Sequence, residues 1–180
     1  MEIKLKNLYL IDDLSCESQA FVAAIFINGY KAAGAANEGN GDRTFYSAYD
    51  VEGQRLIWQA EEWCRESSAD VTLEVYVDRL LFEQVERRDR ERFRNRMIKD
   101  MNQGILIGVP DECYRVVHLA LSIKTLLSTR HGIERLRTAI LERAIPALLE
   151  HEKMLNTNIP DGIIRELGVA RDKLVTPWNA

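Results

Sequence analysis

The Asn28-Gly29 pair constrains the fold of this chain more than any other short segment. Both residue types tolerate the positive φ angles of a type I′ turn, whose twist matches that of an antiparallel hairpin. The preceding segment, Phe21 to Ile27, is rich in β-forming residues, and the chain returns from Tyr30 to Ala36. The sequence therefore predicts a β-hairpin that turns at Asn28-Gly29.

The returning strand of this hairpin consists mostly of Ala and Gly, so it offers little side-chain volume for packing. A strand of this kind must let another element approach its backbone closely. We expect a helix to lie against it, and a bound ligand is the alternative.

Two further strands and a helix complete the predicted N-terminal part. Ile3 to Ile11 alternates loosely between apolar and polar residues, and Arg43 to Tyr49 carries alternating aromatic residues. Together with the hairpin they predict a mainly antiparallel meander of four strands. Asp50 is placed to cap a helix that runs through Ser67, and the apolar face of this helix should cover the sheet.

The second half of the chain is mainly helical in pattern. A long charged helix should start at Asp70 or Thr72 and run to about Gln103, with an apolar stripe that thins between Leu81 and Phe93. The segments expected after it are short strands at Ile105 to Val109 and Tyr114 to Leu119, helices at Ser122 to Thr129 and Ile133 to about Leu155, and a short helix from Asp161 to Leu167.

Within the predicted helix from Ile133 to Leu155, Pro146 should introduce a kink or a division. The apolar residues expected to face the core are Leu136, Ile140, Leu141, Ala144, Leu148 and Leu155.

These patterns predict an α+β fold, in which an N-terminal antiparallel β-meander covered by a helix precedes a long charged helix, a short β-hairpin and C-terminal helices. A length of 180 residues and a hydrophobic content of 46% suit one core of ordinary size. We therefore expect a single domain over residues 1–180, with a β-rich part at 1–68 and a mainly helical part at 69–180.

The charge and the distribution of apolar residues argue against nucleic acid and membrane as general partners, although a local basic stripe remains compatible with the total charge. A formal net charge of -4 does not favour nucleic acid, and no uncharged apolar run reaches the roughly 18 residues needed to span a membrane. Met1 to Lys6 does not resemble a signal peptide, so we expect a cytoplasmic protein. The three cysteines are far apart and form no zinc or redox motif.

The run from Phe21 to Ala32, the loop from Asn37 to Gly41 and the Phe45-Tyr46 pair resemble the N-terminal portion of uncharacterised bacterial and phage-associated hypothetical proteins, and Leu155 to Ile159 is similar to a segment in the same group. The resemblance carries no assigned activity and no catalytic residue. It implies a setting among phages or mobile elements, in which such a protein binds a host or viral component.

The loop from Asn37 to Arg43 is the first candidate site. Its glycines can expose backbone N–H groups to a small anionic ligand such as a nucleotide, although the loop lacks the P-loop pattern and a plain flexible connection is the alternative. Its oxygen-bearing residues do not match an EF-hand, so we expect no metal and no cofactor. The residues expected to hold the ligand are Asn37, Asn40, Asp42, Arg43 and Tyr46.

The second candidate site is an arginine row on the long helix, formed by Arg88, Arg92 and Arg96. These residues are four apart and project along one side, where they can grip phosphates or an acidic protein surface. The alternative is a solvated helix held by intrahelical ion pairs with the interleaved Glu and Asp residues. The apolar face of the same helix, formed by Phe93, Met97 and Met101, could instead pack against a second copy.

The chain offers few residues suited to acid-base or nucleophilic catalysis. His118, His131 and His151 belong to no hydrolase or metalloprotease motif, and Leu155 stands where a second zinc-binding histidine would follow His151-Glu152. We therefore expect a non-enzymatic protein that binds a host or viral protein through its arginine-rich helix. The alternatives are a protein that binds or sequesters a small anionic ligand and a structural homo-oligomer.

Overall fold

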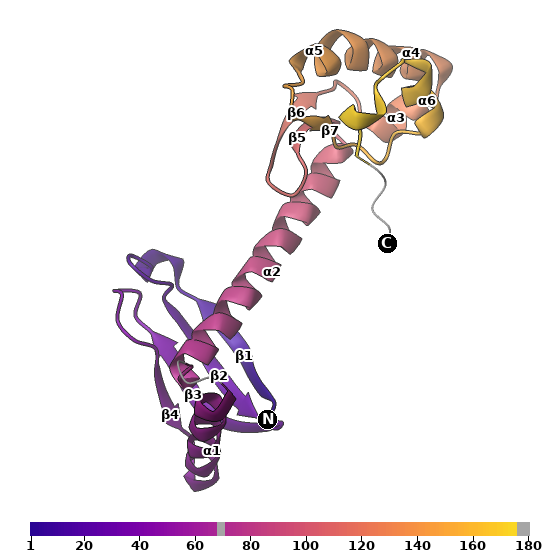
Figure 1. The fold of residues 1–180 in the computed structure, drawn as a ribbon. Helices are drawn as coiled ribbons and strands as arrows, with labels where there is room; N and C mark the ends of the chain where they lie inside the picture. The colour runs from indigo at the N-terminus through magenta and orange to yellow at the C-terminus, as the bar shows by residue number, and fades with distance from the viewer. Residues whose placement is uncertain (68–70, 176–180) are drawn as a thin grey trace. The chain divides into compact units, whose positions relative to one another are not determined.

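The computed structural model describes residues 1–67 and 71–175, and the chain divides into two compact units, Met1–Arg87 and Arg88–Ala180 (Figure 1). The predicted α+β class is confirmed: a four-stranded sheet and a helix precede a long helix, a second small sheet and short helices. The N-terminal elements are β1 Ile3–Leu10, β2 Phe21–Ile27, β3 Tyr30–Asn37, β4 Phe45–Ala48 and α1 Val51–Ser67, followed by α2 Leu73–Met101.

The N-terminal sheet has the order β1-β2-β3-β4, and every neighbouring pair is antiparallel. Asn28 and Gly29 adopt φ angles of 49° and 85°, and Ile27 pairs with Tyr30 across the turn. These angles lie in the left-handed region that a type I′ turn requires. The hairpin predicted from Asn28-Gly29 is confirmed, and so is the meander.

Helix α1 lies directly against β3, the strand that consists mostly of Ala and Gly. A Cβ atom placed on Gly53 of α1 would lie 2.2 Å from the carbonyl oxygen of Ala32, so only glycine permits this approach. The Asp50 carboxylate accepts a hydrogen bond from the Gly53 N–H at 2.7 Å, as expected of a helix cap. The neighbour that the Ala- and Gly-rich strand requires is therefore a helix.

The core of the N-terminal unit lies between the sheet, α1 and the first turns of α2. Leu73, Val77 and Leu81 of α2 join the buried residues of the sheet and of α1. The Thr72 hydroxyl oxygen accepts from the Val75 N–H at 3.2 Å at the start of this helix. Asp70, the other start considered from the sequence, lies outside the described residues.

Helix α2 carries no buried residue between positions 82 and 96. Its apolar stripe resumes at Met97 and Met101, which are buried with Leu106 and Leu155 in a cluster of the C-terminal unit. The thinning of the stripe predicted between Leu81 and Phe93 is therefore confirmed.

The C-terminal unit combines a three-stranded antiparallel sheet of order β6-β5-β7 with short helices. Its elements are β5 Gly104–Val109, β6 Cys113–His118, α3 Ile123–Leu127, α4 Arg130–Ala139, a π-turn at Ile140–Ala144, α5 Ile145–Ala147, β7 Lys153–Met154 and α6 Asp161–Glu166. The second hairpin expected from the sequence is confirmed as β5 and β6.

The predicted helix from Ile133 to Leu155 is wrong beyond Ala147. Pro146 lacks the N–H that would continue the α-helical ladder, and the chain leaves the helix at Leu148 with an extended ψ of 127°. Residues 153–154 then pair with β5 instead.

Two of the side chains expected to face inward from this helix do not do so. Leu141 is exposed, and Leu155 is buried in the cluster beside α2, away from the helix. The last short helix begins at Asp161 as predicted, and Pro160 occupies its N-cap position.

A buried carboxylate joins the segment after α5 to β6. Glu152 is only 5% exposed, and its carboxylate accepts hydrogen bonds from both terminal nitrogens of Arg115 and from the Leu149 N–H at 2.9 Å. Arg115 also donates to the carbonyl oxygen of Ala147. The segment between α5 and β7 has little regular structure of its own. These hydrogen bonds therefore fix its position against β6.

Acidification is expected to destabilise this unit through Glu152. The hydrogen bonds from Arg115 and from the Leu149 N–H hold the pKa of Glu152 below its usual value of 4.5. The resulting stabilisation is complete above pH 4.5 and is lost as the pH falls through the lower, folded-state pKa. Glu152→Gln should therefore lower the free energy of unfolding in urea by about 2 kcal/mol at pH 7 and by less at pH 3.

The exposed pair of Asp161 with Arg165, 3.7 Å apart, provides the control. Asp161→Asn should change the free energy of unfolding little at either pH, because exposed ion pairs contribute little. A loss for Glu152→Gln that is the same at both pH values would contradict the assignment.

Candidate functional site

The loop after β3 uses its polar groups to hold itself together. The Asn37 side-chain oxygen accepts from the Ser18 hydroxyl at 3.1 Å and from the Gly39 N–H at 2.8 Å, and its amide donates to the Asp42 carbonyl at 2.9 Å. The Gly41 N–H donates to the Ser18 hydroxyl oxygen at 3.2 Å. The backbone N–H groups expected to cradle a phosphate are therefore already bonded within the protein.

The five residues predicted to form a ligand site are not brought together. Asn37 and Asp42 line one hollow, whereas Tyr46 lines another with Glu61 and Arg65. Asn40 and Arg43 are exposed and line neither of these hollows.

Tyr46 is directed to α1, where its hydroxyl donates to Glu61 at 2.5 Å. Burial and this hydrogen bond raise the pKa of Tyr46 far above its usual value. The phenol is therefore committed to a structural contact with the helix.

The hollow beside Asn37 has a volume of about 430 Å³ and an apolar wall that includes Phe21 and Phe82. Its charged lining residues are Asp42 and Asp78, and Asp78 accepts a hydrogen bond from the Thr44 hydroxyl at 2.6 Å. Two carboxylates disfavour an anion electrostatically, so this geometry gives the expected anionic ligand no support.

The arginine row lies in the stretch of α2 that carries no buried side chain. Arg92 and Arg96 are exposed, and Arg88 is partly buried. Arg92 pairs with Asp89 at 3.8 Å, and both side chains are more than 60% exposed. Exposed pairs of this kind contribute little to stability, so a partner carboxylate can replace Asp89 at small cost.

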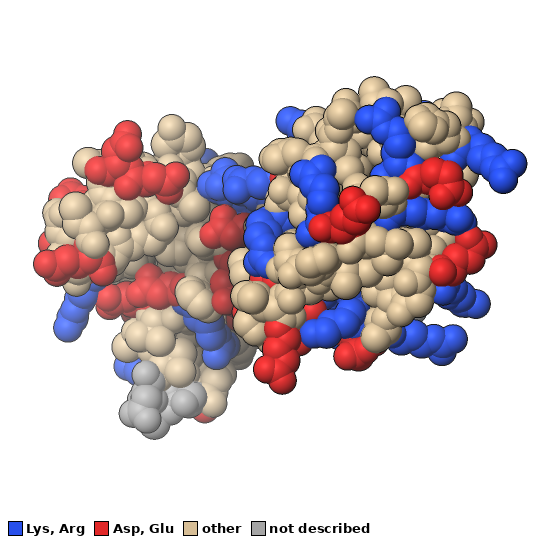
Figure 2. Space-filling view, turned by 90° about the horizontal axis from the view of Figure 1, so that it is seen from above, with Lys and Arg blue, Asp and Glu red and all other residues tan. Residues whose placement is uncertain are grey.

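The two units differ in charge. Residues 1–87 contain 8 Lys and Arg against 16 Asp and Glu, and residues 88–180 contain 16 against 12, so formal charges of -8 and +4 make up the total of -4. Figure 2 shows Lys and Arg side chains spread over the face of the C-terminal unit that it presents, interspersed with Asp and Glu side chains. The chain as a whole is therefore acidic, whereas its C-terminal unit is basic.

Two of the three side chains considered for self-association are buried within the chain. Met97 and Met101 are 2% and 4% exposed in the cluster with Leu106 and Leu155. Phe93 meets the ring of Tyr114 edge-on, with centroids 5.3 Å apart. A homo-oligomer built on this face would have to displace these contacts.

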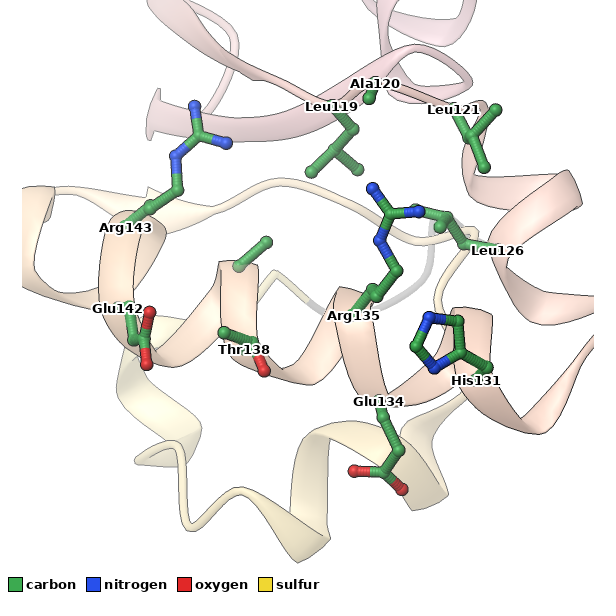
Figure 3. A pocket seen from close by; sticks show the side chains of 11 residues that line it. Leu119, Ala120, Leu121, Leu126, His131, Glu134, Arg135, Thr138, Glu142 and Arg143 are labelled. Atoms are coloured by element: carbon green, nitrogen blue, oxygen red, sulfur yellow. The ribbon is translucent and has the colours of Figure 1, made fainter.

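A cleft of about 420 Å³, which was not predicted from the sequence, lies along α4 and the π-turn. The lining residues include Glu134 and Glu142 as well as Arg135 and Arg143. Figure 3 shows the two arginines extending toward Leu119, whereas the carboxylates of Glu134 and Glu142 point away from Leu119, on the other side of the helix in this view. His131 stands beside Arg135, and Leu121 and Leu126 contribute apolar surface.

A sequence signal for this cleft did exist. His131, Arg135, Ala139 and Arg143 recur at every fourth position, so each lies beside the next on a helix, although the side-chain direction turns by about 40° with each step of four residues. The small Ala139 leaves a hollow between the two arginines. The apolar side of the cleft, from Leu119 to Leu126, comes from the segment before α4 and could not be assigned from this spacing.

No family model, no curated protein and no solved structure matches this chain. Among residues 1–67 and 71–175, no group of three or more His, Cys, Asp or Glu side chains could hold a metal ion. In the same part of the chain, no helix has the length and apolar character needed to cross a membrane.

Proposed function

We propose that this chain is a non-enzymatic binding protein whose basic C-terminal unit engages an acidic protein surface through the arginine row Arg88, Arg92 and Arg96. The observation that carries the proposal is the separation of charge between the two units, +4 over residues 88–180 against -8 over residues 1–87. A basic unit in an acidic chain attracts a negatively charged partner and orients the encounter.

The state of the arginine row supports this role. The two exposed arginines have either a weak ion pair, as in Arg92 with Asp89, or no carboxylate within 4 Å among the described residues, as in Arg96. Guanidinium groups bind carboxylates through two parallel hydrogen bonds, which gives orientation as well as affinity. The resemblance to phage-associated proteins makes a host or viral protein the partner class to examine.

Reversal of charge along the row should abolish capture of the partner. We expect the Arg88→Glu, Arg92→Glu, Arg96→Glu variant to recover at least about tenfold less partner than the unmodified chain, because each contact becomes repulsive. The measurement is affinity purification from the source organism, quantified by mass spectrometry after nuclease treatment. Unchanged recovery would disprove the proposal.

Three exposed arginines of the N-terminal unit provide a control with the same change in charge. The Arg55→Glu, Arg65→Glu, Arg79→Glu variant should retain the partner. Equal loss in both variants would show that total charge, and not the arginine row, governs binding. Loss of all captured protein on nuclease treatment would point to nucleic acid instead.

A further inference from the structure

We propose that the cleft along α4 is a binding site for a phosphomonoester, held by Arg135, Arg143 and His131. The cleft volume of about 420 Å³ lies in the range of small-molecule sites. The inference does not depend on the arginine row of α2 or on the function proposed above.

The guanidinium groups of Arg135 and Arg143 are not engaged elsewhere among the described residues. Neither Arg135 nor Arg143 has a hydrogen bond or an ion pair with any described residue, whereas nearby Arg137 is bound by Glu134 and Glu166. Both unengaged groups extend toward Leu119 on the cleft side (Figure 3). Two guanidinium groups match the charge of a dianion, and each can donate two parallel hydrogen bonds to phosphate oxygens.

The π-turn aligns these two guanidinium groups. An α-helix advances about 100° per residue, so eight residues would turn Arg143 about 80° away from Arg135. In this chain the Ile145 N–H bonds to the Ile140 carbonyl, five residues back, and the wider turn rotates each residue through a smaller angle. Arg143 is thereby returned to the side of the helix that carries Arg135.

The cause of the π-turn lies in the sequence. Pro146 has no N–H to bond the Glu142 carbonyl, and its ring crowds that carbonyl in a regular α-helix. A wider turn before the proline removes the conflict. The same residue that ends the helix therefore helps to place Arg143, and π-turns are frequent at functional sites.

The remaining wall of the cleft is mainly apolar. Leu119, Leu121 and Leu126 present apolar surface beside the cationic side, and the imidazole of His131 adds an N–H donor. An inorganic anion would leave this apolar surface uncovered. The site is therefore suited to a phosphate group that carries a small organic substituent.

Calorimetric titration of the full chain in phosphate-free buffer tests the assignment. We expect phenyl phosphate to bind several-fold more tightly than inorganic phosphate, because its ring covers the leucines, and more tightly than the monoanion benzenesulfonate. Equal affinity for inorganic phosphate would overturn the ester assignment. Absence of saturable binding of phenyl phosphate would overturn the site.

Variants locate the binding. The double variant Arg135→Gln, Arg143→Gln should bind phenyl phosphate at least about tenfold more weakly. Arg165 is an exposed arginine of α6, and Arg165→Gln should leave the affinity unchanged. Arg143→Lys keeps the charge but loses the paired donors, so an intermediate affinity is expected. Equal affinity in the double variant and the unmodified chain would overturn the proposal.

Pro146→Ala tests the role of the π-turn without removing a cationic group. Alanine at this position permits a regular helix, which should rotate Arg143 away and lower the affinity for phenyl phosphate several-fold. The helical content measured by circular dichroism should be retained or increased. An unchanged affinity in this variant would contradict the alignment by the π-turn.

Discussion

Gly53→Ala is expected to lower the free energy of unfolding of the N-terminal unit by about 3 kcal/mol. The added Cβ would lie 2.2 Å from the carbonyl oxygen of Ala32 and 3.1 Å from its carbonyl carbon. Both atoms belong to the backbone of a central strand, so no side-chain rotation can relieve the overlap. Alanine favours a helix over glycine by about 1 kcal/mol, which offsets only part of this cost.

Urea unfolding followed by tryptophan fluorescence measures the effect. Trp58 and Trp63 both lie on α1, and a Trp178→Phe background restricts the signal to that helix.

Gly162→Ala in α6 is the matched control, because nothing lies within 4 Å of its added Cβ. Calorimetry should show it unchanged or stabilised by up to about 1 kcal/mol. If Gly53→Ala were as stable as the unmodified chain, α1 could not lie so close to β3.

Asn156→Leu is expected to lower the free energy of unfolding of the C-terminal unit by about 3 kcal/mol. Asn156 is 7% exposed, and its side chain accepts from the Leu106 N–H at 2.6 Å and donates to the Gly104 carbonyl at 3.1 Å. Beyond the end of β7, this side chain thus satisfies the edge of β5. Leucine has a similar volume but leaves both backbone groups buried without a partner.

The same substitution at an exposed asparagine provides the control. Asn102 donates from its side chain to the Ile98 carbonyl at 3.3 Å, and Asn102→Leu should change the stability by no more than about 0.5 kcal/mol. Calorimetry of both variants compares them directly. A similar, small loss in the two would show that Asn156 is not needed to satisfy β5.

Features encoded within a few residues were predictable. The Asn28-Gly29 turn was found because only a few residue types accept positive φ at both positions, and the cap at Asp50 because its acceptor needs only an N–H three residues on. The small side chains of β3 indicated a close neighbour, since such a strand cannot fill its own side of a core.

Features that join distant segments were not predictable. The role of Asn37 depends on Ser18, nineteen residues earlier, whose contact turns the polar groups of the loop inward. The helix expected to reach Leu155 was overextended because the edge of β5 offered residues 153–154 hydrogen bonds that apolar periodicity does not reveal. The cleft along α4 was missed because its two sides come from different segments of the chain.

The sequence by itself therefore determined the hairpin, the meander, the cap of α1 and the break at Pro146, because each follows from local backbone geometry. Only the tertiary structure decided that α1 packs against the Ala- and Gly-rich strand β3, that the polar groups of the loop after β3 bond to one another and to Ser18, and that Arg135 and Arg143 face one apolar wall. Those outcomes depend on which distant groups compete for the same hydrogen bonds and the same buried surface.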